Sequence, residues 1–232
     1  MPSSSTVAAS LPSDCLCVGE MIYVHLLGCL IRLVVAGFLS VDDRILLITA
    51  GDKISQDSMC YRHNALKDDS YLGSVRYVHA GIVFVELFTK TRDDVSNLVT
   101  SEIPRQECFP GPTIQPPGQT PTQALLHGSD QQPVVVTLEE RQFPDVTGSC
   151  LCFQAQALQP EIVGSLVTST QGCPGGSRLL TTYGAVYAVK DLGGVRYALV
   201  GNMQEAIEAL QTLEEYREKM ISLVTPIQQA ST

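Results

Sequence analysis

The hexapeptide LGSVRY at residues 72–77 returns as LGGVRY at residues 192–197, about half a chain length later. In both copies a glycine precedes a strand-like run, VRYVHAGIVFVELF in the first and VRYALVG in the second. If the copies are equivalent, Val75 and Val195 begin corresponding strands of two related units. The hexapeptide therefore predicts a duplicated fold.

Shorter matches occur in the same order along the two halves of the chain. Residues 15–17 and 150–152 both read CLC, Ala36–Leu39 resembles Val163–Leu166, and Arg44–Leu47 resembles Arg178–Thr181. Between the halves lies a stretch rich in proline, glycine, glutamine and threonine. Proline removes a backbone donor and fixes φ, so this stretch favours a linker over a sheet.

These observations divide the chain of 232 residues into five parts. We expect a mobile tail at 1–14, a first β unit at 15–100, and a proline-rich linker or long loop at 101–133. A second β unit follows at 134–226 and ends in a helix at 202–224, and a short tail occupies 227–232. The fold class predicted is mostly β, or α+β, with one or two small β-barrel units and a C-terminal helix.

The C-terminal helix is predicted from its cap and its periodicity. Asn202 is a good N-cap, and Glu205 three residues later resembles a capping box. Apolar residues then recur at helical spacing as far as Val224, and Pro226 would end the helix. Such a stripe packs on its own sheet or in the groove of a partner.

Composition and charge argue against two classes of ligand. The formal net charge is −9, and the 15 lysines and arginines are spread singly, so no basic groove for a polyanion is evident. Met21–Leu39 is long enough to cross a membrane, but Arg32 lies near its centre and two glycines interrupt it. Two buried strands are the prediction for this segment, with no membrane contact.

The eight cysteines indicate a reducing compartment. The N-terminal residues lack a signal-peptide pattern, no N-x-S/T acceptor occurs, and several cysteines lie inside apolar runs. We therefore expect a cytoplasmic or nuclear protein. The two C-x-C pairs would lie on one face of a strand rather than bind a metal, so neither a metal site nor a cofactor is expected.

The first unit resembles the Sm-like (LSm) β-barrel family. The resemblance rests on GEMIYVHLLG, on VAGFLSVDDRILLITAGDKI and on LGSVRYVHAGIVFVEL. Gly37 and Leu39 take the place of the family's G-x-L on a strongly bent strand, and Asp42 takes the acidic place. A residue without Cβ suits a sharp bend. A five-stranded OB-type barrel would give a similar pattern.

The sequence departs from the Sm-like family at the positions that bind RNA, and this changes the function that we expect. Ile45–Leu47 are aliphatic where RNA-binding members carry an asparagine, and no Arg-Gly pair follows the closing strand. The resemblance then implies a scaffold that associates through strand edges, with protein partners in a hetero-oligomer and at most indirect RNA contact. No small-molecule substrate is expected.

Candidate contact residues follow from this interpretation. The expected partner-binding side chains lie on the closing strands and on the C-terminal helix, and the expected RNA contacts lie beside them. The partner-binding set is Val78, Ile82, Phe84, Leu210, Leu213 and Met220, and the RNA-contact set is Arg76 and His79.

No catalytic signature stands out in the sequence. The serine-hydrolase, P-loop, dinucleotide and zinc-protease motifs are all absent. Glycine-rich GCPGGS at 172–177 is expected to connect strands. The function predicted is a non-catalytic subunit or adaptor of a protein or ribonucleoprotein complex. The alternatives are an OB-fold protein that binds single-stranded nucleic acid, and an enzyme that uses Cys60, with His63 nearby, or Cys173.

Overall fold

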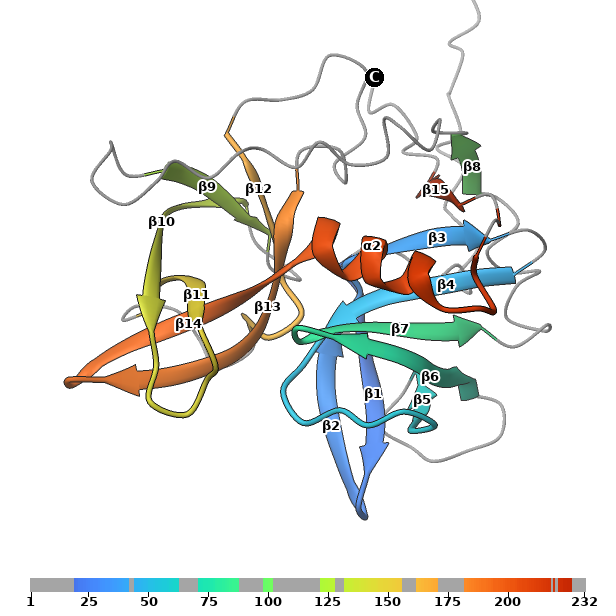
Figure 1. Ribbon diagram of the computed structural model, residues 1–232, viewed down its shortest axis with the longest axis horizontal. Coiled ribbons are helices and arrows are strands. Elements are labelled where there is room, and N and C mark those ends of the chain that lie inside the picture. Colours follow the sequence, from blue (N-terminus) through green and yellow to red (C-terminus); the bar gives the residue numbers. More distant parts are fainter. Residues whose placement is uncertain are drawn as a thin grey trace, which may run out of the picture.

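The structure is a computed structural model, and it describes residues 19–41, 44–62, 71–87, 98–101, 122–127, 132–155, 162–170, 182–217, 219 and 221–226. The described residues form two antiparallel β-barrels and one helix that lies against the first of them (Figure 1). The predicted class, mostly β with barrels and a C-terminal helix, is confirmed. No described helix is long and apolar enough to cross a membrane.

The first sheet has nine strands in the order β2-β1-β5-β6-β7-β4-β3-β15-β8. Their bounds are β1 (Met21–Leu26), β2 (Cys29–Val34), β3 (Gly37–Val41), β4 (Arg44–Ala50), β5 (Met59–Tyr61), β6 (Tyr71–His79), β7 (Ile82–Leu87), β8 (Leu98–Ser101) and β15 (Ile221–Pro226).

The first sheet curls round into a six-stranded barrel because β2 and β3 are two halves of one bent strand. Only Val35 and Ala36 separate them, and both are paired. Val35 exchanges hydrogen bonds with Gly19 and Glu20 on the β1 side, and the N–H of Ala36 donates to the carbonyl of Ile48 in β4. The bend comes directly before Gly37, as the sequence predicted, but the circuit has six strands rather than five.

The second sheet is a closed barrel in the order β10-β11-β14-β13-β12-β9. Its strands are β9 (Thr122–His127), β10 (Val134–Gln142), β11 (Ser149–Gln154), β12 (Leu166–Ser169), β13 (Thr182–Leu192) and β14 (Val195–Asn202). Strand β9 falls within the stretch expected as a linker. Closure leaves the barrel without a free edge along most of its circumference.

The two barrels share one topology. If the bent strand β2–β3 is counted once, the strands of each barrel numbered along the chain neighbour one another in the circular order 2-3-6-5-4-1. The predicted duplication is thus present in the strand order.

The hexapeptides that suggested the duplication are not equivalent positions in it. LGSVRY lies inside β6, the fifth strand of its barrel. LGGVRY ends β13, forms the hairpin turn and begins β14, the sixth strand. Gly73 is close to the carbonyl of Glu86 within the sheet, whereas Gly193 is in a turn with φ of +59°. The sequence identity between the two hexapeptides is coincidental.

The helix α2 (Met203–Thr212) begins as predicted and ends earlier than predicted. The Asn202 side chain accepts a hydrogen bond from the N–H of Glu205, 3.1 Å away, which confirms the N-cap. Leu213 is already extended, and residues 221–226 are the strand β15, which pairs with β3 and β8. The apolar spacing beyond Thr212 therefore reflects strand and turn residues that return to the first sheet.

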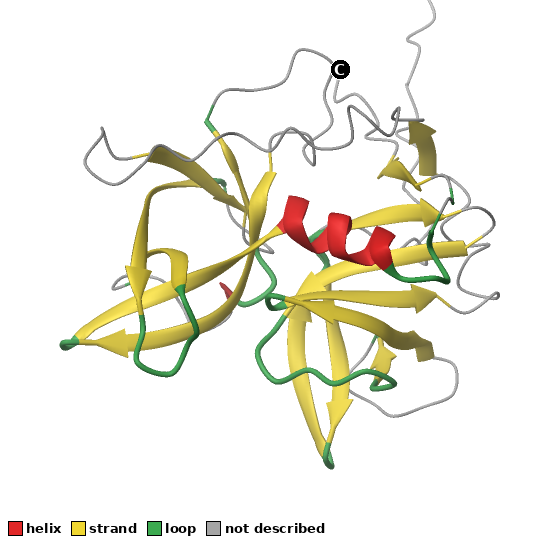
Figure 2. Ribbon diagram, viewed as in Figure 1, coloured by secondary structure: helices red, strands yellow, loops and turns green. Residues whose placement is uncertain are grey.

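One hydrophobic core joins both barrels to the helix. Leu39, Ile48 and Phe84 from the first barrel pack with Leu166 and Ala185 from the second barrel. From the C-terminal segment this core takes Met203, Ala206, Ile207, Leu210 and Tyr216, all at most 2% exposed. Figure 2 shows the helix lying across the strands of the first barrel, directly after it leaves the second.

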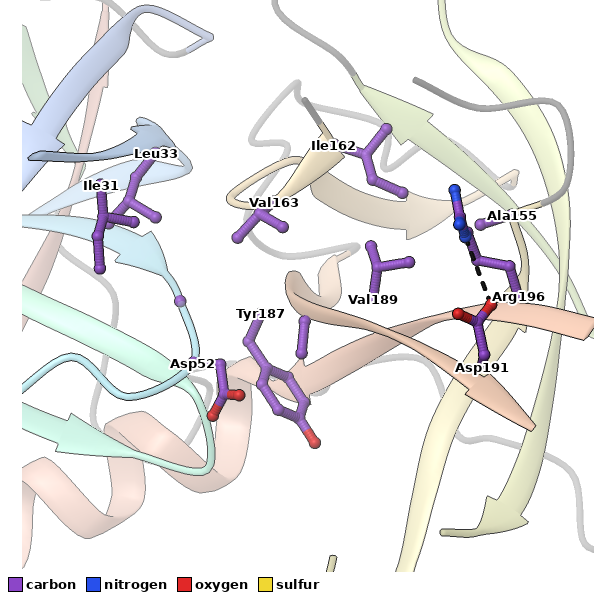
Figure 3. A pocket seen from close by; sticks show the side chains of 12 residues that line it. Ile31, Leu33, Asp52, Ala155, Ile162, Val163, Tyr187, Val189, Asp191 and Arg196 are labelled. Atoms are coloured by element: carbon purple, nitrogen blue, oxygen red, sulfur yellow. Dashed lines mark hydrogen bonds and ion pairs between the residues drawn. The ribbon is translucent and has the colours of Figure 1, made fainter. Parts of the chain in front are cut away.

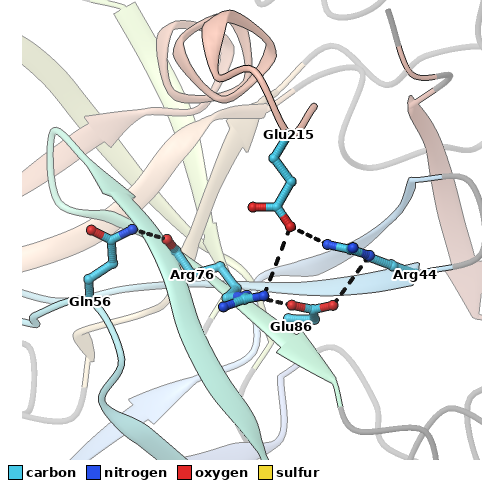
Figure 4. Close-up of polar contacts among 5 residues, drawn as sticks. All are labelled: Arg44, Gln56, Arg76, Glu86 and Glu215. Carbon is cyan, nitrogen blue, oxygen red and sulfur yellow. Dashed lines mark hydrogen bonds and ion pairs between the residues drawn. The ribbon is translucent and has the colours of Figure 1, made fainter. Parts of the chain in front are cut away.

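A cluster of four charges holds the end of the C-terminal segment to the first barrel (Figure 4). Glu86 on β7 stands between Arg44 on β4 and Arg76 on β6, and it pairs with both guanidinium groups. Glu215, just past the helix, pairs with the same two arginines. The charges alternate in sign and are partly exposed, so the cluster orients this segment more than it stabilises it.

Glycine lets the barrels approach each other at backbone distance. A Cβ on Gly164 would lie 2.4 Å from the backbone nitrogen of Val34, and one on Gly201 would lie 2.5 Å from the carbonyl oxygen of Ala80. No side chain fits at either point. Gly164 also has φ of +93°, which disfavours any residue with a Cβ.

A matched pair of substitutions tests this contact between the barrels. Gly148 has a similar φ of +86°, but no atom lies within 4 Å of its added Cβ. Gly148→Ala should therefore cost only the left-handed backbone strain, about 1–2 kcal/mol. Gly164→Ala should lower the free energy of unfolding by about 1–3 kcal/mol more, because Val34 has to move. Urea unfolding measures both, and equal losses would show that Gly164 makes no tight contact.

Candidate functional site

A cavity of about 470 Å³ lies between the barrels. The first barrel contributes Ile31 and Leu33 from β2 and Gly51 and Asp52, which follow β4. The second barrel contributes Ala155, Ile162, Val163 and residues of β13 and β14, including Arg196. The cavity has the size of an ordinary ligand pocket, and most of its walls are apolar (Figure 3).

Tyr187 lies at the point where the first barrel meets this cavity. A Cβ on Gly81 would be 2.3 Å from the Tyr187 ring, so the ring lies directly on the turn between β6 and β7. The carbonyl of Gly81 accepts a hydrogen bond from Gly51, the residue before Asp52. The hairpin turn, Asp52 and the tyrosine thus form one connected wall.

The Tyr187 phenol stays protonated at neutral pH. Burial raises its pKa well above the ordinary value, and the neighbouring Cys150 and the negative charge of Asp52 raise it further. The Tyr187 hydroxyl lies 3.9 Å from the sulfur of Cys150. A protonated phenol beside a carboxylate supplies one donor and one acceptor at this end of the cavity.

The opposite end of the cavity opens to solvent between two charged residues. Asp191 on β13 and Arg196 on β14 face each other across the hairpin, with the arginine Nε 3.5 Å from the carboxylate. Both side chains are more than half exposed. They form a polar rim around an apolar interior (Figure 3).

On the edge that faces the cavity, β13 has no partner strand among the described residues once it passes Val186. The N–H and C=O of Val186 bond to Ser165 and Gly164, on the side of β12. A bulge at Tyr187 follows, and beyond it β13 pairs only with β14 among the described residues. Because backbone groups alternate between the two edges of a strand, those of Val189 and Asp191 point toward the cavity. Within the part of the chain that the structure describes, this edge of β13 is therefore open to an added strand.

The described walls of the cavity contain no histidine, serine, threonine or cysteine. Nor do the described residues contain a cluster of histidine, cysteine and carboxylate groups that could hold a metal ion. The glycine-rich segment Gly172–Ser177, with Cys173, lies outside the described residues, as does His63.

Most residues expected to bind a partner are part of the interior. Ile82, Phe84 and Leu210 are fully buried, and Val78 and Leu213 are partly buried against hydrophobic cores. Met220 lies outside the described residues. The buried side chains stabilise the barrels and the helix and are not available at the surface.

The two expected RNA contacts are engaged with acidic groups. Arg76 belongs to the charge cluster with Glu86 and Glu215, and the His79 Nε2 lies 3.2 Å from the Glu205 carboxylate on α2. Neither lies in the cavity. No sequence motif marks Asp52, Tyr187 or Val189, so these wall residues were not predicted.

Comparisons with known proteins identify the fold. No protein-family model matches the sequence, and no curated protein is similar to it. Among solved structures, a Nocardiopsis protease matches with a TM-score of 0.50 at 15% sequence identity, over 90% of this chain and 98% of that chain. An alpha-lytic protease homolog matches with a TM-score of 0.50 at 10% identity, over 83% of this chain and 95% of that one.

These similarities correct the expected family. The fold is the chymotrypsin-like arrangement of two six-stranded barrels, so the Sm-like assignment and its OB-fold alternative are wrong. Bent strands, acidic turns and apolar closing strands occur in both kinds of barrel, and the short motifs did not distinguish them.

The function expected from the Sm-like resemblance is wrong as well. The two matched structures are a protease and a protease homolog, which contradicts the expected non-catalytic subunit or adaptor of a protein or ribonucleoprotein complex. Protein partners in a hetero-oligomer and indirect RNA contact were inferred from the edge pairing of Sm-like barrels. Because the fold is not Sm-like, these two expectations are wrong for the same reason. The cysteine-enzyme alternative fits poorly as well, since burial raises the pKa of Cys60 to about 12.

Alkylation tests the state of the cysteines. Cys29 is exposed, whereas Cys60 and Cys152 are fully buried with pKa values raised to about 12, chiefly by burial. Only the thiolate reacts, so iodoacetamide at pH 8 should modify Cys29 in the native protein and spare the other two until urea unfolds it. Mass spectrometry of the digested protein identifies which cysteines are alkylated. Labelling of native Cys60 as fast as Cys29 would contradict this arrangement.

Proposed function

We propose that this protein acts on polypeptides, which it takes up as extended chains in the cleft between its barrels, and that peptide-bond hydrolysis is its reaction. The observation that carries the first part is the unpaired edge of β13 beside the cavity. The second part is supported by the two matched structures, which are a protease and a protease homolog.

An extended peptide is the ligand that suits this edge. The unpaired N–H and C=O groups of Val189 and Asp191 repeat at the spacing of a β-strand. An added strand would satisfy them with main-chain hydrogen bonds, which are independent of the peptide's sequence. The adjoining cavity offers room for side chains, and Asp52 and Tyr187 offer polar contacts at the end next to the first barrel.

Peptide-bond hydrolysis requires catalytic groups in the cleft, which peptide binding does not require. A serine-protease mechanism needs a nucleophile, a base within hydrogen-bonding distance and a third group that orients the base. The described walls supply two carboxylates, Asp52 and Asp191, and the Tyr187 phenol, but neither a nucleophile nor an imidazole. A nucleophile would have to come from a residue other than those of the described walls. Peptide binding and peptide hydrolysis are therefore measured separately.

A proline substitution on the free edge tests the uptake. Val189→Pro removes the N–H that points to the cleft without touching a bond to β14, and proline is tolerated at such positions. Val189→Ala keeps the N–H and is the matched control. Loss of this one main-chain hydrogen bond should weaken peptide binding by up to about tenfold in the proline variant.

Fluorescein-labelled casein, an unfolded polypeptide, serves as the probe. Its anisotropy reports binding, and its breakdown into small fragments reports hydrolysis. Equal binding by Val189→Pro and Val189→Ala would show that the β13 edge is not the binding site. Binding without fragments from the full-length protein would refute hydrolysis and leave uptake standing, whereas absence of binding would refute the proposal.

A further inference from the structure

We infer that the cleft selects polypeptides that carry an aliphatic side chain at the residue paired with Val189. This inference rests on the proposed uptake of an extended chain along β13. It concerns which chain is taken up, and it is carried by the geometry of the cavity wall.

The register of the edge decides where the peptide's side chains go. Residues directly opposite each other in neighbouring strands project to the same face of the sheet, whether the strands are parallel or antiparallel. A peptide residue opposite Val189 therefore projects its side chain to the side of the Val189 side chain. That side chain lines the cavity and packs against the core of the second barrel, which includes Ala155 and Ile162 (Figure 3).

The surface that this peptide side chain meets is aliphatic. Ala155 and Ile162 are at most 8% exposed and belong to the core of the second barrel. Val163 and Ile31 pack against the core of the first barrel and form the facing wall. An aliphatic side chain placed here gains by burial. A charged one loses hydration, and the arginine of the described walls, Arg196, is already paired with Asp191.

The polar rim, Asp191 and Arg196, affects the peptide side chain two residues further along, but more weakly. A side chain opposite Asp191 would project toward the Asp191–Arg196 pair, which is open to solvent. Water can hydrate any side chain there, so the structure predicts tolerance at this position. The expected pattern is one strict aliphatic position and a permissive one at a spacing of two.

Peptide binding tests the pattern directly. A set of fluorescein-labelled ten-residue peptides of glycine and serine would carry Leu, Phe, Ala or Asp at a single central position. The Leu peptide should bind the full-length protein at least tenfold more tightly than the Asp peptide. Moving the Asp to a position two residues away, with Leu kept at the centre, should change affinity less than threefold.

Changing the size of the wall tests whether this cavity is the selective element. Val163→Phe narrows the cavity and should reduce the preference for Leu over Ala about tenfold. Val163→Ala widens it and should raise the affinity for the Phe peptide relative to Leu. Val135→Phe, on an exposed residue of β10 outside the cavity, is the control and should leave the profile unchanged. A misfolded variant would lose all peptides alike, whereas opposite shifts in the two Val163 variants require a size-selective wall.

The outcomes separate this inference from the proposal on which it rests. If casein and all the peptides bind but Leu and Asp bind equally, the selectivity is wrong and uptake along β13 stands. If the Val163 variants keep the wild-type profile, the selective wall lies elsewhere and the inference is overturned. If neither casein nor any peptide binds, the proposed function itself fails.

Discussion

The contact between the two barrels is the constraint on which the rest of the structure depends. Each barrel has its own apolar interior, but neither interior reaches the outer face of β3, β4 and β7. That face is buried by Leu166 and Ala185 of the second barrel and by the apolar side of α2. Removing either partner would leave a large apolar surface of the first barrel in water, so the barrels and helix are stable as one unit.

The cleft is a consequence of how closely the barrels meet. Gly164 and Gly201 bring backbone against backbone at two points, and Gly81 lets the Tyr187 ring lie on the β6–β7 turn at a third. At these points no space remains. The bulge at Tyr187 then turns β13 so that its next residues no longer pair with the segment before β12. The free edge begins where the tight contact ends, which places unpaired backbone beside an apolar cavity.

Local patterns in the sequence predicted the local structure. The alternating apolar runs became strands, the bend before Gly37 is present, and Asn202 caps the helix. The assignment of a family failed because a bent strand and an apolar hairpin are requirements of any small barrel. The hexapeptide misled for a related reason: a glycine followed by Val-Arg-Tyr suits a half-buried strand equally well inside β6 and at the start of β14.

Long-range features were beyond prediction from the sequence. The helix was expected to reach residue 224 because the apolar spacing continues past Leu213, but residues 221–226 pair with β3, nearly 200 positions earlier. The cavity draws Ile31, Asp52, Ile162, Tyr187 and Arg196 from five separate segments, none of which carries a motif. Asp52 and Tyr187 are brought together only by the fold, in which the β6–β7 hairpin turn packs against the bulged strand β13.

The path of the chain explains why the two barrels behave as one body. The chain builds the first barrel, then the second, and then returns through α2 and β15 to pair again with β3 of the first. The cluster of Arg44, Arg76, Glu86 and Glu215 fixes the segment between helix and strand at a defined place on that barrel. Because the C-terminal segment bridges both barrels, opening the cleft requires the helix to leave its core. This bridge holds the two walls of the cleft at a fixed separation, and a cleft of fixed width can discriminate between side chains by size.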